Sequence, residues 1–97
     1  MPEIQDVLLE VVRRKNLEWK VPGLNPLTAD SNIFNSVDSF AVVDLLLETE
    51  EAVEKFAGSY VPLGDECLFD AHKSPLREFS QWVAYVSKVV GEKQSRG

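Results

Sequence analysis

The sequence is poor in the side chains that build metal centres and covalent cross-links. Its 97 residues include one cysteine, Cys67, and one histidine, His72. A single cysteine cannot form a disulfide within the chain, and one cysteine with one histidine does not supply the ligand set of a zinc site. We therefore predict no metal site and a reducing, cytoplasmic environment. No acid, base and nucleophile converge in the pattern, so we predict no catalytic residues and no enzyme.

Long apolar runs are also missing. The sequence contains no apolar stretch of the roughly 20 residues that a helix needs to cross a bilayer. Met1 is not followed by the basic and then apolar pattern of a secretory signal. We therefore expect no membrane insertion.

Positive charge is scarce. Ten Lys and Arg residues face 16 Asp and Glu residues, which gives a net charge of -6. That balance disfavours nucleic-acid phosphates and anionic membranes as partners and favours basic protein surfaces. The imbalance is greatest over residues 38–54, which contain six acidic residues and neither Lys nor Arg.

What the chain does have is enough apolar content for one core. Hydrophobic residues make up 44% of the sequence and charged residues 27%, and 97 residues suit one small domain. We assign residues 1–91 to a single helical domain that is expected to be a monomer. Residues 92–97 carry no apolar side chain and are expected to fray.

Helical periodicity dominates the apolar pattern. Residues 3–15, 39–56 and 75–90 each repeat apolar side chains at helical spacing, and residues 65–70 can form a short third helix with Leu68 and Phe69 turned inward. The pattern predicts an all-α four-helix bundle of three main helices and one short helix. A long loop, residues 16–37, separates the first two helices. Its apolar side chains are expected to hold it in place; they are Leu17, Trp19, Leu24, Leu27, Ile33 and Phe34.

The second predicted helix has three distinct faces. Its core stripe is predicted to be Val42, Leu45, Leu46, Thr49, Val53 and Phe56, and its opposite face Ala41, Asp44, Glu48, Glu51 and Lys55. A mixed flank lies between them, consisting of Phe40, Val43, Leu47, Glu50 and Glu54. A partner could steer on the acids and anchor on the apolar residues.

The triplet Asp38-Ser39-Phe40 stands where an irregular polar run gives way to this helix. Unpaired backbone N–H groups and the positive end of the helix dipole favour an anionic group at such a place, for example a phosphate esterified to Ser39. A simple helix cap is the plainer interpretation of the triplet.

The triplet, the following Leu45-Leu46-Leu47-Glu48 and the Glu50-Glu51 pair resemble the attachment region of acyl carrier proteins. The resemblance covers most of residues 4–90. With Phe40 after the serine, the chain looks more like specialised stand-alone carriers, including D-alanyl carriers, than the housekeeping fatty-acid carrier.

The resemblance implies a 4′-phosphopantetheine arm on Ser39, transferred from coenzyme A by a phosphopantetheinyl transferase, with Asp38 and Phe40 beside it. An acyl or aminoacyl intermediate of lipid, polyketide or related biosynthesis would be held on the arm as a thioester. Loading ligases and acyl-processing enzymes with basic docking surfaces would bind Val43, Asp44, Leu47, Glu48, Glu50 and Glu51. The alternative is an unmodified acidic helical domain for protein–protein interaction.

Overall fold

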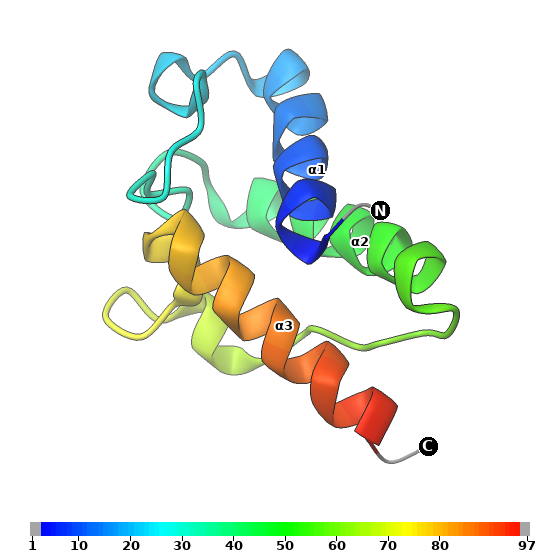
Figure 1. The fold of residues 1–97 in the computed structure, drawn as a ribbon. Coiled ribbons are helices and arrows are strands. Elements are labelled where there is room, and N and C mark those ends of the chain that lie inside the picture. The colour runs from blue at the N-terminus through cyan, green and yellow to red at the C-terminus, as the bar shows by residue number, and fades with distance from the viewer. Residues whose placement is uncertain (1–2, 96–97) are drawn as a thin grey trace.

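The computed structural model describes residues 3–95, and within them the chain is helical, with no strand (Figure 1). The helices are α1 (Ile4–Trp19), α2 (Ser39–Ala57) and α3 (Phe79–Ser95). Three short 3₁₀ turns accompany them: η1 (Pro22–Leu24), η2 (Glu66–Phe69) and η3 (Pro75–Arg77). Helix α1 contacts both α2 and α3. The all-α class is therefore confirmed, as a small bundle of three α-helices.

Helix α1 is longer than the predicted segment 3–15. At its start the Asp6 carboxylate accepts the backbone N–H of Glu3 at 3.2 Å. At its end Lys20 takes a left-handed conformation, with φ 58°, and donates its N–H to the Asn16 carbonyl at 2.7 Å. The Asn16 side chain also bonds the backbone N and O of Val21, at 2.9 and 3.1 Å. Because of these bonds, α1 extends about one turn beyond the basic residues that end the predicted segment.

Helix α2 matches its prediction to within a residue. Asp38 precedes it in extended conformation, and its carboxylate accepts the N–H of Ala41 at 2.9 Å. Gly58 follows it with φ 82°, a left-handed conformation that glycine adopts without steric cost. The cap at Asp38 and the helix end at Gly58 each depend on residues within one turn, which explains why the sequence predicts both ends of α2.

The C-terminal third differs from its prediction in detail. Residues 66–69 form a 3₁₀ turn instead of a short α-helix. Ser74 and Pro75 begin only the 3₁₀ turn η3, because Glu78 is extended, with φ -142°, and α3 starts after it. Helix α3 passes Gly91 and remains helical to Ser95. The tail that was expected to fray is therefore helical as far as Ser95, and residues 96–97 lie outside the described part.

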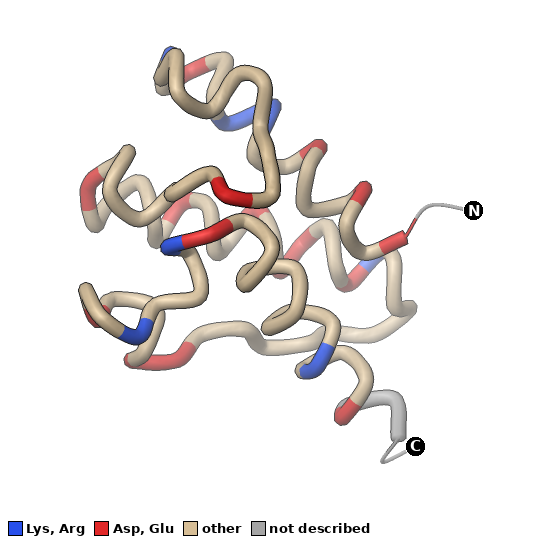
Figure 2. Tube along the Cα trace, turned by 60° about the vertical axis from the view of Figure 1, so that its left-hand side comes forward, with Lys and Arg blue, Asp and Glu red and all other residues tan. Residues whose placement is uncertain are grey.

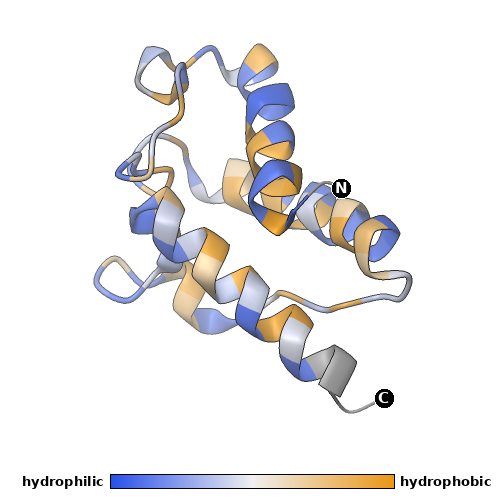
Figure 3. Ribbon diagram, in the orientation of Figure 1, coloured by the Kyte–Doolittle hydropathy of each residue, from blue (hydrophilic) through white to orange (hydrophobic). Residues whose placement is uncertain are grey.

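One apolar core lies between the three helices. Figure 3 shows hydrophobic and hydrophilic residues alternating along each helix, as expected where only one face is buried. The core stripe of α2 is confirmed at Val42, Leu45, Thr49 and Val53, which are buried, and Leu46 packs against them. The helical pattern predicts that Phe56 and Phe69 turn inward, whereas in the structure they are 38% and 45% exposed. Phe56 is the last residue but one of α2, and Phe69 is the last residue of η2.

The loop between α1 and α2 is ordered by its contact with the start of α3. The N–H groups of Ile33 and Phe34 donate to the carbonyl of Leu76 at 2.9 and 3.0 Å. In return, the N–H groups of Phe79 and Ser80 donate to Ser31 and Ala29, at 2.9 and 3.0 Å. Leu24 and Ile33 are buried, and Trp19, Leu27 and Phe34 pack against the core. The predicted anchoring is confirmed except at Leu17, which is 68% exposed.

Candidate functional site

Ser39 is the first residue of α2, and its side chain is exposed. The capping carboxylate of Asp38 is used by Ala41, and the Val42 N–H makes the first helical bond, to the Asp38 carbonyl. Within the described residues the N–H groups of Ser39 and Phe40 have no acceptor, as is usual in a first helical turn. A pocket of about 210 Å³ adjoins Ser39 and is lined by Phe34, Val37, Asp38, Val42 and Phe69.

Three large apolar side chains follow Ser39 along the outer face of α2. Phe40 is 87% exposed, Val43 44% and Leu47 60%. We call these three residues the apolar stripe. Their spacing places them along one side of the helix, and covering them would remove apolar surface from water. The stripe is thus available for a partner, beside the serine hydroxyl.

The acidic residues of α2 do not form one uniform surface. Figure 2 shows acidic positions along much of the trace and basic positions at few places. Asp44 forms an ion pair with Lys15 of α1. Glu48 and Glu51 line a groove of about 340 Å³ between α1 and α2, and Glu51 also pairs with Lys55 at 3.7 Å. Two of the predicted partner-binding acids therefore face the groove against α1.

The Lys15–Asp44 pair joins α1 to α2. The Lys15 side chain is only 12% exposed, and its hydrogen bond to Asp44 raises the pKa of Lys15 above its usual value. A raised pKa in the folded state means that the pair stabilises the fold below the ordinary lysine pKa of about 10.4. That stabilisation is lost as the pH rises through the folded-state pKa.

We expect Asp44→Asn to lower the free energy of unfolding by about 1 kcal/mol near neutral pH, because it removes the charge on one side of a partly buried pair. The difference from the native chain should shrink above the lysine pKa range. Urea unfolding followed by circular dichroism at several pH values measures both. A difference that stays constant into the alkaline range would show that Lys15 is not the partner that matters. Glu54→Gln, on the exposed flank, is the control.

Glu50 has an internal role that the sequence did not predict. Its carboxylate accepts the backbone N–H of Leu63 at 2.7 Å and the hydroxyl of Tyr60 at 3.4 Å. The Leu63 carbonyl in turn accepts the hydroxyl of Tyr85 on α3 at 2.6 Å. Glu50 thus ties the extended segment after α2 to the helix. These partners lie 10 and 13 residues away from Glu50, so no local pattern signals them.

The single cysteine does not line the pocket beside Ser39. Cys67 is partly buried, and burial raises the pKa of its thiol, which keeps it protonated at neutral pH. No cluster of three or more His, Cys, Asp or Glu side chains in the described residues is placed to hold a metal ion.

Comparison of the chain with protein-family models, with curated proteins and with solved structures finds no match. Across residues 3–95, none of the helices is both long enough and apolar enough to span a bilayer.

Proposed function

We propose that this chain is a carrier protein that holds an acyl or aminoacyl group as a thioester on a 4′-phosphopantetheine arm attached to Ser39. The observation that carries the proposal is the exposed Ser39 hydroxyl at the first turn of α2, directly before the apolar stripe. The chain itself makes no bond. A transferase uses coenzyme A and Mg²⁺ to join the arm's phosphate to the Ser39 oxygen, and adenosine 3′,5′-bisphosphate leaves.

The first turn of α2 suits the phosphodiester that this step creates. The N–H groups of Ser39 and Phe40, which have no acceptor in the described residues, point toward the helix N-terminus. The positive end of the α2 dipole favours the phosphate by about 0.3–1 kcal/mol at an exposed site. Asp38 meanwhile holds the first turn in place through Ala41. These features support Ser39 as an acceptor.

The proposal gives the apolar stripe and the acidic residues a common role in delivery. Phe40, Val43 and Leu47 would anchor a transferase, a loading ligase or an acyl-processing enzyme, and Glu48 and Glu51 would attract basic residues at the rim. Such contacts form rapidly and weaken as salt rises, which suits transient transfer. Asp44 and Glu50 contribute less to docking, because they are engaged within the fold.

The test is intact mass after incubation with coenzyme A, Mg²⁺ and a broad-specificity phosphopantetheinyl transferase. We expect the native chain to gain one phosphopantetheine group and Ser39→Ala to gain none. Ser87→Ala, which removes another exposed serine on α3, should gain as much as the native chain. Thermal unfolding of all three chains checks that folding is intact. A well-folded native chain that gains nothing with several transferases would overturn the proposal.

The second candidate is an unmodified acidic domain for protein–protein interaction. The 87% exposure of Phe40 favours it, because a large apolar side chain on a surface commonly marks a contact site and needs no modification to act as one. The two candidate functions predict different effects for one variant. Ser39→Ala abolishes function in the carrier and leaves an interaction domain unchanged.

A further inference from the structure

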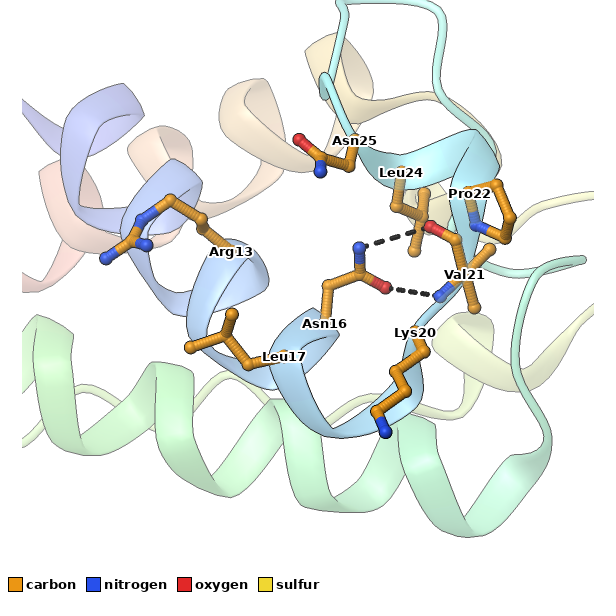
Figure 4. A pocket seen from close by; sticks show the side chains of 8 residues that line it. All are labelled: Arg13, Asn16, Leu17, Lys20, Val21, Pro22, Leu24 and Asn25. Atoms are coloured by element: carbon orange, nitrogen blue, oxygen red, sulfur yellow. Dashed lines mark hydrogen bonds between the residues drawn. The ribbon is translucent and has the colours of Figure 1, made fainter.

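A second hollow lies at the C-terminal end of α1. It has a volume of about 550 Å³ and lies between the last turns of α1 and the turn η1 (Figure 4). Arg13, Leu17 and Lys20 line it from the helix side, and Leu24 and Asn25 from the turn. It shares no lining residue with the pocket beside Ser39.

The wall of this hollow is held by hydrogen bonds and does not need a ligand to form it. Figure 4 shows the Asn16 amide bonded to both backbone groups of Val21, at 2.9 and 3.1 Å. The Lys20 N–H bonds the Asn16 carbonyl at 2.7 Å, and the Asn25 N–H bonds the Pro22 carbonyl at 3.2 Å. A preformed wall lowers the ordering cost of binding.

The lining of the hollow is basic, unlike the chain as a whole. Among the described residues no Asp or Glu lines it, whereas the whole sequence has a net charge of -6. Its cations are Arg13 and Lys20. Arg13 donates through Nε and Nη2 to Glu10, at 2.9 and 2.6 Å, so within the described residues its Nη1 remains available to another acceptor. Lys20, which forms no ion pair there, supplies the uncompensated charge.

The apolar rim of the hollow is open to solvent at Leu17, which is 68% exposed, whereas Leu24 belongs to the buried core and is only 4% exposed. A small ligand is normally buried over most of its surface, and this open rim would not do that. An extended segment of another protein could cover Leu17 and reach both cations at once.

We propose that this hollow binds an acidic peptide segment of a partner protein that carries a large apolar side chain. The apolar side chain packs against Leu17 and the exposed Pro22, and flanking carboxylates pair with Lys20 and with Nη1 of Arg13. This docking site uses none of the Ser39 machinery. It therefore stands or falls separately from the carrier role.

The test is a nuclear magnetic resonance titration of the full chain with two blocked peptides, Glu-Glu-Leu-Phe-Glu-Glu and Lys-Lys-Leu-Phe-Lys-Lys. We expect the acidic peptide to shift the signals of Asn16, Lys20 and Asn25 with a Kd below about 1 mM at low salt. Lys20→Glu should weaken binding by about threefold or more, the size of a lost exposed ion pair. Leu17→Ser should weaken it similarly.

Lys88→Glu is the matched control, because it makes the same charge change at an exposed position on α3. The proposal is overturned if Lys88→Glu weakens binding as much as Lys20→Glu does. It is also overturned if neither peptide shifts these signals, if the basic peptide shifts them equally, or if the shifts map to the apolar stripe. Equal shifts from sodium butyrate would assign the hollow to a small carboxylate instead of a peptide.

Discussion

Replacing Trp82 by alanine is expected to lower the free energy of unfolding by about 3–5 kcal/mol. Trp82 is 1% exposed, lies on α3 and stacks on Tyr85, with ring centroids 5.7 Å apart and planes 15° from parallel. Removing the indole leaves a cavity at the centre of the core. Small domains are stable by about 5–15 kcal/mol, so this is a large share of the total. Urea unfolding followed by circular dichroism measures the loss.

Trp82→Phe separates ring packing from the indole N–H. Nε1 of Trp82 is buried and has no hydrogen-bond partner in the described residues, a situation that costs about 1–3 kcal/mol. Phenylalanine keeps an apolar ring and removes that unpaired donor, so we expect less than half the loss seen with alanine. Equal destabilisation of the two variants would contradict this account of the indole N–H.

The second large effect on stability is expected from replacing Glu50. Glu50→Ala should lower the free energy of unfolding by about 2 kcal/mol, because it leaves the buried Leu63 N–H without its acceptor. The same carboxylate raises the pKa of Tyr60, chiefly through its negative charge. The phenolate of Tyr60 should therefore appear at higher pH in the native chain than in the variant. Urea unfolding and an absorbance titration of the tyrosines measure the two effects.

Glu50→Gln is the matched variant, because the amide keeps an oxygen that can accept from Leu63 and loses only the charge. It should retain most of the stability and still lower the pKa of Tyr60 toward its ordinary value. Glu51→Ala, one residue along, breaks only an exposed pair with Lys55 and should cost less than about 1 kcal/mol. An equal cost at Glu50 and Glu51 would refute the internal role of Glu50.

The sequence predicts the fold wherever the deciding interaction is local. Asp38 and Gly58 bound α2 through contacts within one turn, and the apolar repeat correctly places Val42, Leu45 and Val53 in the core. At Phe56 the same repeat fails, because burial near the end of a helix depends on what packs over it. The predicted start of α3 is wrong for a related reason. The loop between α1 and α2 donates two hydrogen bonds to the Leu76 carbonyl, and this contact interrupts the predicted helix.

In the candidate site, too, the features that depend on local sequence are predictable and those that depend on other elements are not. Ser39 at a helix start and an exposed apolar stripe are both predictable, since each follows from helical geometry and capping. The engagement of Asp44 with Lys15 and of Glu50 with Leu63 is not, because those partners come from other elements. The hollow beside Lys20 also escapes sequence analysis, since the left-handed end of α1 and the following turn create it together.

The backbone hydrogen bonds between the α1–α2 loop and the segment at the start of α3 also have a consequence for synthesis of the chain. The loop that leads into Ser39 is held by Leu76, Phe79 and Ser80, which the ribosome adds about 40 residues after the serine. During translation the loop leaves the ribosome before those partners do. The folded setting of Ser39 is therefore complete only once residues 76–80 have also left the ribosome.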